Sequence, residues 1–314
     1  MSDGAVRTGR LIGYFEAVAA ACLWGSSGIF AVHLFRLGVP PETVALLRPV
    51  VGVLFLFVAL AAARPESLRI DVRGLAVLGL GGGLAVAVFQ VAYQFSTDAV
   101  GVPRTVALLY LAPAFVTAAS GPLLGEWPLR RRIALVALTL AGVWLSVLGA
   151  DEVPARFGTS GLAWGALAGA SYAAYTLLGR FAAPLFGSAR TVFYSTLGAC
   201  VVLAIVLPVA AGPIVLPTGA RAWILLVAFG GLTVALAQFL FFDALGRIEA
   251  SGASTAAAAE PAVAAVLATM LLSQGLSPLG WIGVAMIVAG VAGVGGTAIG
   301  RRTSRPRPHR PGRS

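Results

Sequence analysis

The two halves of this chain repeat each other at a spacing of 148 residues. The matches need no gap, and they include a Gln and a Pro that lie inside long apolar runs. A duplicated membrane chain with a helix-breaking Pro at the same place in each half is typical of carriers that bind their cargo between the halves. The matched positions are Gly82–Leu84 with Gly230–Leu232, Gln90 with Gln238, Pro113–Ala114 with Pro261–Ala262, and Ala141–Val143 with Ala289–Val291.

The composition places the chain in a bilayer. Hydrophobic residues make up 59% of the 314 positions and charged residues 11%, whereas soluble domains carry about 25% charged residues. Apolar stretches of about 20 residues, the length that a helix needs to cross a membrane, recur along the chain. We therefore predict an all-α polytopic membrane protein with ten transmembrane helices. The predicted spans are residues 11–34, 42–63, 74–96, 100–119, 130–149, 161–181, 189–210, 222–244, 251–272 and 278–299.

The arginines predict how the chain is oriented. The net charge is +10 and every basic residue is Arg, which on its own could indicate nucleic-acid binding. The arginines concentrate, however, in alternate interhelical segments and after residue 300, as the positive-inside rule describes. This distribution predicts a bacterial inner-membrane protein with both termini in the cytoplasm. Four arginines fall on the other side, and they are Arg36, Arg104, Arg156 and Arg221.

Five helices in each half predict an inverted repeat, because an odd number makes the two halves enter the membrane from opposite sides. The predicted organisation is a cytoplasmic segment at 1–10, a first repeat at 11–150, a second repeat at 161–299, and a basic cytoplasmic tail at 300–314. The tail alternates Arg with Pro, and we expect it to be disordered and to anchor the topology against anionic lipid. The first span could be a signal peptide, but it continues without a convincing cleavage site and is interpreted as retained.

Four short motifs carry a resemblance to a known family. They are Trp24–Ser27 in the first span, Leu47–Arg48 in the second, Leu111–Pro113 in the fourth and Leu123–Glu126 before the fifth. Together they resemble the EamA-type branch of the drug/metabolite transporter superfamily. The resemblance implies two inverted five-helix repeats around a central cavity, and the export or exchange of amino acids, other small metabolites or drugs. The family usually repeats its Leu-Gly-Glu in the second half, where this chain has Ser273–Gly275.

Glu260 is the most pointed candidate, because it lies near the middle of the ninth predicted span. A carboxylate there costs roughly 2.5–3.5 kcal/mol on insertion scales and normally faces a cavity or a partner. The aligned residue of the first half is Ala112, so the repeat itself does not require an acid. The Glu260–Pro261 pair also resembles the threonine/homoserine exporter-like members of the family. Glu260 either binds a cationic ammonium group or carries the coupling proton; the alternative is a structural ion pair, for example with Arg48.

Arg48 has two interpretations of its own. It lies about seven residues into the second predicted span, which is roughly 10 Å of helix. Its side chain either extends to the outer interface or binds a substrate carboxylate. Glu260 and Arg48 together would match the two charges of an amino acid.

Several further polar and aromatic residues are candidates for the substrate pathway. Trp24, Ser26 and Ser27 either allow close helix packing or face the cavity, with Tyr172 and Tyr175 at the equivalent depth of the second half. The paired glutamines bond either between helices or to substrate. The complete predicted set is Trp24, Ser26, Ser27, Arg48, Gln90, Tyr93, Tyr110, Tyr172, Tyr175, Gln238 and Glu260, with helix breaks at Pro113 and Pro261.

An intramembrane enzyme is a less fitting interpretation. Gly25–Gly28 matches the Gly-x-Ser-Gly of rhomboid-type proteases, but that chemistry needs a His on another helix to activate the serine. The chain has two His residues: His33 lies six residues along the same helix, and His309 lies in the tail. No metal-ligand cluster or phosphate-binding loop is recognisable. We therefore expect no enzyme activity, no cofactor and no nucleic-acid partner.

The sequence thus predicts a secondary active transporter that exports or exchanges a small organic metabolite through a central cavity by alternating access. An amino acid or a related compound is the expected cargo, and a proton is the candidate coupling ion. One alternative is a proton-driven exporter of drugs or toxic compounds, and a second is a membrane scaffold or sensor that does not transport. The expected partners are the small-molecule substrate and membrane lipid, with the chain as a monomer or homodimer.

Overall fold

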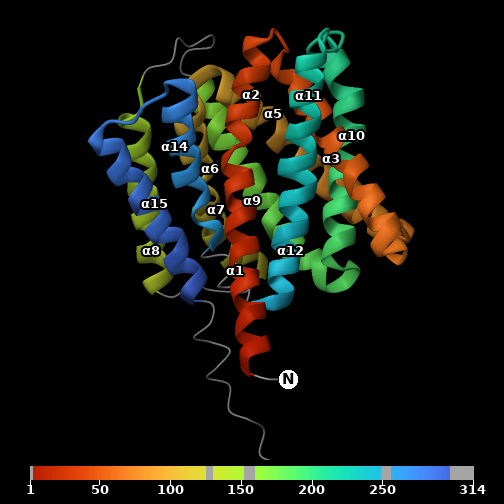
Figure 1. Cartoon of the computed structure of the whole chain (residues 1–314), viewed down its shortest axis with the longest axis horizontal. Coiled ribbons are helices and arrows are strands. Elements are labelled where there is room, and N and C mark those ends of the chain that lie inside the picture. The colour runs from red at the N-terminus through yellow and green to blue at the C-terminus, as the bar shows by residue number, and fades with distance from the viewer. Residues whose placement is uncertain (1–2, 125–129, 152–159, 249–255, 298–314) are drawn as a thin grey trace, which may run out of the picture.

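The computed structural model describes residues 3–124, 130–151, 160–248 and 256–297 of the chain, and these are almost entirely helical (Figure 1). Glu126 and the basic tail after residue 300, both singled out in the sequence, lie outside the described residues. The helices of the first half are α1 (Asp3–Gly25), α2 (Ser27–Arg36), α3 (Pro41–Ala63), η1 (Pro65–Leu68), α4 (Val72–Gly74), η2 (Leu75–Gly82), α5 (Gly83–Val100), α6 (Val102–Leu109), α7 (Ala112–Leu124) and α8 (Arg130–Leu148). Those of the second half are α9 (Ser160–Phe186), α10 (Ser188–Ala210), α11 (Ala220–Gly230), η3 (Gly231–Leu236), α12 (Ala237–Arg247), α14 (Glu260–Leu272) and α15 (Pro278–Thr297).

Six helical runs in the described residues are long and apolar enough to cross a membrane. They are Leu11–Arg36, Pro41–Ala63, Val72–Val100, Val102–Ala119, Ser188–Ala210 and Ala220–Phe241. Three shorter apolar helices accompany them, Ile133–Leu148, Glu260–Leu272 and Pro278–Gly293. The multi-pass membrane class follows from these lengths and compositions, while ten crossings remain a prediction.

Two helices are interrupted at positions 148 residues apart. In the first half the helical pattern stops at Tyr110–Leu111 and resumes with α7, and in the second half it stops at Ala258–Ala259 and resumes with α14. Pro is the second residue of both resuming helices, at positions 113 and 261. Because Pro lacks an N–H and its ring clashes with the preceding turn, it fits the first turn of a helix and interrupts a longer one. The first run is also broken, at Ser26, without a counterpart break in α9.

The third and eighth predicted spans contain π-helical segments that the sequence patterns did not predict. Segment η2 precedes α5, and η3 lies between α11 and α12. Glycines beside these segments bring backbones of the two halves together. A Cβ added to Gly83 would lie 2.7 Å from the carbonyl carbon of Gly198 on α10, and one added to Gly230 would lie 2.7 Å from the backbone oxygen of Arg48 on α3. Glycine is therefore required at both contacts for the present backbone spacing.

The two halves interlock rather than sitting side by side. Helix α1 packs on α12, and its repeat counterpart α9 packs on α5. Helix α3 packs on α11 and η3, while its counterpart α10 packs on α5 and η2. Helices α8 and α15 pack along each other, as Figure 1 also shows. These contacts between the halves thus occur in equivalent pairs.

Polar contacts tie the helix ends together at both faces of the bundle. At the N-terminal face, where α1 begins, Arg247 forms ion pairs with Glu16 (3.2 Å) and Asp243 (2.8 Å). At the opposite face, Arg104 donates to the backbone oxygen of Ala150 at 2.8 Å. Gln274 lies 148 residues after Glu126, and its Oε1 accepts from the N–H of Val102 at 2.9 Å. This residue therefore caps the start of α6 from the connection between α14 and α15.

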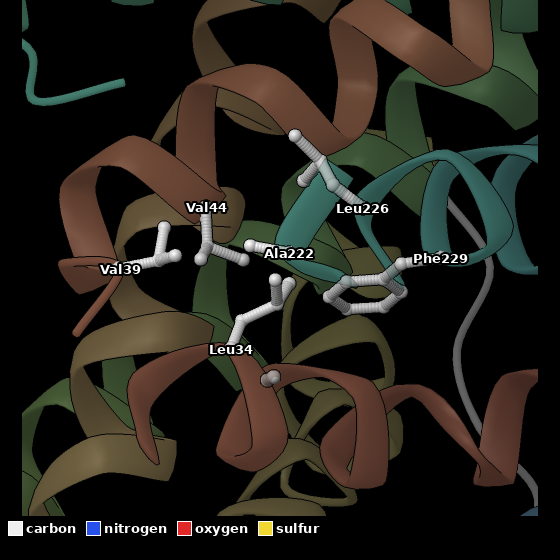
Figure 2. Close-up of a cluster of buried hydrophobic side chains, with 7 residues drawn as sticks. Leu34, Val39, Val44, Ala222, Leu226 and Phe229 are labelled. Atoms are coloured by element: carbon white, nitrogen blue, oxygen red, sulfur yellow. The ribbon is translucent and has the colours of Figure 1, made fainter. Parts of the chain in front are cut away.

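The half of the bundle near the opposite face is closed by three buried apolar clusters. Because lipid is as apolar as these side chains, the clusters stabilise the bundle through van der Waals packing more than through exclusion from water. Figure 2 shows the side chains of the first cluster pointing toward one another. The Leu34 cluster comprises Ala31, Leu34, Val39, Val44, Ala222, Leu226 and Phe229; the Leu46 cluster comprises Leu46, Val86, Ala87, Ala199, Leu203 and Leu207; and the Val102 cluster comprises Val32, Val102, Val106, Ala264, Ala268 and Leu272.

The half near the N-terminal face is less closely packed. A cavity of about 1310 Å³ lies between α3, α10 and the α11–η3–α12 run, and it reaches the helix ends at Arg64, Gly187 and Asp243. A smaller cavity of about 450 Å³ separates α7 from α9. Among the described residues, both cavities therefore lie in the half near the N-terminal face, while the three clusters close the half near the opposite face, which we call the sealed half.

Candidate functional site

Arg48 lies inside the bundle, and its side chain joins both halves of the chain. Only 7% of the residue is exposed. Its Nη1 donates to Oε1 of Gln90 on α5 at 3.0 Å, while Nε and Nη2 both donate to the hydroxyl of Thr233 on η3, at 3.3 and 3.2 Å. The guanidinium also lies over the ring of Phe229, 4.6 Å from its centroid. We call Arg48, Gln90, Phe229 and Thr233 the Arg48 cluster.

The local structure directs Arg48 inward. Helix α3 begins at Pro41, so the residue lies about two turns inside the helix. The buried guanidinium is bonded to α5 and η3. It therefore does not extend to the outer interface, which was one of the two interpretations of Arg48. The close packing of Gly230 against the backbone of Arg48 brings η3 near enough for Thr233 to meet the side chain. Thr233 is fixed in turn, because its hydroxyl donates to the backbone oxygen of Phe229 at 2.7 Å.

Glu260 and Tyr110 meet at the two interrupted helices. Glu260 is the first residue of α14, and Tyr110 lies at the break before α7. The Tyr110 hydroxyl donates to Oε2 of Glu260 at 3.2 Å. One partner comes from each half, and each stands where a helix of its own repeat is broken. In transporters built from inverted repeats, broken helices at the interface of the repeats form the substrate site.

Arg48 and Glu260 interact electrostatically without forming an ion pair. Glu260 contributes to the electrostatic environment of Arg48, and also to that of Tyr93 and Tyr172. In the described part of the chain, however, no ion pair within 4.0 Å joins the two side chains. The structural ion pair considered from the sequence is therefore not formed in this structure. Each of the two side chains is instead held by neutral groups.

Aromatic rings line the space near Glu260. The ring of Phe89 on α5 lies 5.7 Å from that of Tyr93 and 5.7 Å from that of Tyr172 on α9, measured between centroids. Tyr175 lies one turn further along α9 and packs against the Leu46 cluster. The aromatic faces contributed by α5 and α9 thus come from different halves of the chain.

Other predicted site residues take different positions. Trp24 packs against Phe241 on α12, with ring centroids 5.2 Å apart. The Ser26 hydroxyl donates to the backbone oxygen of Leu23 at 2.7 Å, and Ser27 is buried beside it. Gln238 lines the large cavity at the N-terminal face, although its repeat equivalent Gln90 bonds Arg48. The described structure therefore brings Arg48, Gln90, Tyr110 and Glu260 into the interior between the halves and leaves Gln238 outside this group.

Three residues of this interior group were missed in the sequence: Phe89, Phe229 and Thr233. Thr233 carried a usable signal, because it is a lone polar residue in an apolar run and its aligned residue in the first half is Ala85. The two Phe residues carried none, since Phe is common throughout the apolar runs. Among the described residues, no group of three or more His, Cys, Asp or Glu could hold a metal ion.

The chain is similar in sequence to known proteins and similar in fold to a solved structure. Over 157 residues the chain is 30% identical to the uncharacterized transporter YwfM of Bacillus subtilis (strain 168), a match that covers 49% of this chain and about half (51%) of that protein. It is 26% identical over 292 residues to the uncharacterized transporter YxxF of the same organism, covering 88% of this chain and 87% of the relative. A crystal structure with 22% sequence identity superposes with a TM-score of 0.64 over 95% of this chain and 99% of that chain, which supports the fold.

The family assignment rests on both halves. The model of the EamA-like transporter family matches residues 11–148 and again residues 159–296. The two matched segments are offset by 148 residues, the spacing of the internal repeat, and together they cover nearly all of the apolar part of the chain. This chain is therefore a multi-pass membrane protein that belongs to the EamA-like transporter family.

Proposed function

We propose that the chain is a secondary active transporter of a small zwitterionic metabolite, an amino acid or a related compound. Ten helices form two inverted five-helix repeats in the bacterial inner membrane, with both termini in the cytoplasm. Alternating access exposes the interior between the repeats to one face and then to the other. The matched helix breaks and the equivalent packing contacts of the two halves support the inverted arrangement.

One observation carries the choice of substrate class: two groups of opposite charge, the buried Arg48 and the half-buried Glu260, lie between the halves, each held by neutral partners. An arginine has five N–H donors. In the described contacts, three of these N–H groups, one on each nitrogen, donate to Gln90 and Thr233. The second N–H of Nη1 and the second N–H of Nη2 are not used in these bonds. Those two donors can bind a carboxylate. The Tyr110 hydroxyl donates to Oε2 of Glu260, so that Oε1 can accept from an ammonium group.

Glu260 also suits the role of a proton carrier. It can alternate between binding an ammonium group and binding a proton, so that cargo and proton compete for one carboxylate. The Tyr110 hydroxyl stabilises the charged form as a donor and can accept from the protonated form. Exchange of cargo for proton at one site would couple export to the proton gradient without a second ion site.

A second candidate is a proton-driven exporter of aromatic or cationic drugs. The rings of Phe89, Tyr93 and Tyr172 favour it, because aromatic faces near a carboxylate attract organic cations. Such a substrate would use Glu260 and the rings but not Arg48. The threonine/homoserine exporter-like character of the Glu260–Pro261 pair favours the amino-acid alternative.

The test is counterflow in proteoliposomes. Vesicles are loaded with one unlabelled compound from a panel of amino acids and cationic drugs, and uptake of the same compound in labelled form is measured. We expect saturable uptake of an amino acid, because counterflow requires only binding and alternating access. Saturable uptake of cationic drugs alone would select the second candidate. Folded protein that gives no counterflow across the panel would contradict both and favour a scaffold or sensor.

Variants separate the two charges. Arg48→Gln should abolish amino-acid counterflow, because the carboxylate loses its donors, and should leave uptake of cationic drugs intact if the second candidate holds.

Glu260→Gln removes the acceptor for both substrate classes and the proton site. If Glu260→Gln transports at the full rate with unchanged pH dependence, neither role belongs to Glu260.

A further inference from the structure

Gln94 is a buried polar residue whose side chain has no bonding partner in the described structure. It lies on α5, one helical turn beyond Gln90 toward the opposite face. None of its surface is exposed. Within the described residues, neither its Oε1 nor its Nε2 has a hydrogen-bond partner. The amide therefore has two donors and an acceptor unused.

Several polar side chains close to Gln94 on the same helix are bonded, whereas the Gln94 amide is not. The hydroxyl of Ser96 bonds that of Thr105 at 2.8 Å, and the Thr97 hydroxyl donates to the backbone oxygen of Tyr93 at 2.8 Å. Gln90, one turn back, bonds Arg48. A primary amide without partners in a membrane interior is costly, since no bulk water can satisfy it. The cost of this unbonded amide is best explained if a ligand bonds the Gln94 side chain during part of the transport cycle.

Gln94 stands on a polar line that leads out of the Arg48 cluster. Residues 90, 94 and 98 are spaced by four, so they lie near one another along one side of α5. Asp98, which is half-buried, is close to the end of the helix at Val100. The eight residues between Gln90 and Asp98 span about 12 Å of helix. The line thus connects the interior between the halves with the opposite face.

The surroundings of this line belong to the sealed half of the bundle. The Leu34, Leu46 and Val102 clusters are formed by α2, α3, α5, α6, α10, α11 and α14 in that half. Phe229 joins this seal to the site. It points into the Leu34 cluster (Figure 2), its ring stacks on that of Phe30 at 5.5 Å, and the guanidinium of Arg48 lies over it. Parting the seal along α5 would expose Gln94 directly beyond the Arg48 cluster.

We propose that Gln94 is a second, outer binding position for the transported solute. When the seal parts, the amide donates to the solute's carboxylate and accepts from its ammonium group as the solute passes between the Arg48 cluster and the opposite face. The sealed state, in which the amide has no partner, is then less stable at this position than the open, loaded state. This proposal rests on the proposed function for its ligand, but its pathway can be tested without any solute.

The experiment is thiol labelling in intact cells. Cys22 and Cys200 are first replaced by Ala, and single cysteines are introduced by Gln94→Cys, Ala92→Cys and Leu37→Cys. Ala92 is fully buried on the same helix, against Ala168 and Leu109, and serves as the buried control. Leu37 is 42% exposed at the opposite face and serves as the accessible control. The probe is a membrane-impermeant, positively charged methanethiosulfonate.

We expect Gln94→Cys to react at least tenfold faster than Ala92→Cys, and more slowly than Leu37→Cys. Addition of the amino acid that shows counterflow should slow the reaction at Gln94→Cys and leave Leu37→Cys unchanged. Equal rates at Gln94→Cys and Ala92→Cys would overturn the proposal. Fast labelling that a saturating, transported amino acid does not slow would overturn the binding role.

Two further results keep this proposal separate from the proposed function. Fast labelling of Gln94→Cys together with no counterflow from the panel would support the outer pathway and contradict the amino-acid assignment. In the otherwise native chain, Gln94→Leu should raise the KM of counterflow about tenfold with the thermal unfolding midpoint unchanged or raised. A purely structural amide would give the reverse, a lowered midpoint with an unchanged KM.

Discussion

A single hydroxyl holds the buried Arg48 in place from the other half of the chain. Thr233 accepts from two nitrogens of the guanidinium and donates to its own helix. Gln90 supplies a further hydrogen bond from α5, and the ring of Phe229 lies against the guanidinium. Because the charge is buried without an ionic partner, its stability depends on these neutral acceptors. The side chain is therefore both a candidate ligand for substrate and a connection between the repeats.

We expect Thr233→Val to destabilise the protein by about 1–3 kcal/mol, because two N–H groups of a buried cation lose their acceptor while the side-chain shape is kept. The Thr233→Ser variant keeps the hydroxyl and should stay close to the native protein. Thermal unfolding in detergent and amino-acid counterflow measure the two effects. A Val variant as stable and as active as the Ser variant would show that the hydroxyl does not hold Arg48.

At the scale of elements, glycines set the distance between helices of different halves. Gly83 faces the backbone of Gly198 at the junction of α5 and α10, where a side chain has no room. Gly81, two residues earlier in η2, faces only the tip of the Leu178 side chain, 3.4 Å from where its Cβ would be. The two positions differ in packing although both belong to one glycine-rich run.

Gly83→Ala should therefore destabilise the bundle by about 1–3 kcal/mol through overpacking, and Gly81→Ala should be neutral or slightly stabilising because Ala favours the helix. The expected loss corresponds to about 2–4 °C in the unfolding midpoint for each kcal/mol. Size-exclusion profiles after heating measure both variants under identical conditions. The same loss in both would mean that backbone approach at Gly83 is not the cause.

At the scale of the whole molecule, the repeats are related but not equivalent. The matched glutamines show the difference: Gln90 bonds Arg48, while Gln238 lines the cavity at the N-terminal face. The packing differs as well, since α3 contacts α5 in the sealed half, whereas a cavity separates α10 from the α11–η3–α12 run. The molecule is thus duplicated in sequence and asymmetric in this conformation.

We expect Gln90→Leu to lower the rate of counterflow roughly tenfold, the equivalent of one hydrogen bond to a charged group, and Gln238→Leu to change it much less. The two variants make the same substitution at matched positions, so each is the control for the other. Counterflow rates normalised to the amount of folded protein provide the comparison. Equal losses would indicate that both glutamines contact the solute during the cycle.

Much of the architecture was available from local sequence patterns. The lengths of the apolar runs placed the chain in a membrane, and the spacing of 148 residues revealed the duplication that the family match also covers. Arg48 and Glu260 stood out because charges are costly at those depths. Pro113 and Pro261 marked the places near which two helices are interrupted, since Pro lacks the N–H of a helical bond. Pro alone does not set a break, because Pro49, Pro184 and Pro208 lie inside helices.

The sequence by itself therefore determined the membrane class, the duplication and the polar residues worth considering, because each depends on residues adjacent along the chain. Only the tertiary structure decided that Arg48 meets Thr233 and Gln90, that Gln238 lies elsewhere, and that Gln94 has no hydrogen-bond partner among the described residues. These pairings depend on the rotation and depth of each helix. A helix that is apolar on all sides carries no sequence pattern that sets its rotation, so close packing at glycines and cross-half contacts determine it instead.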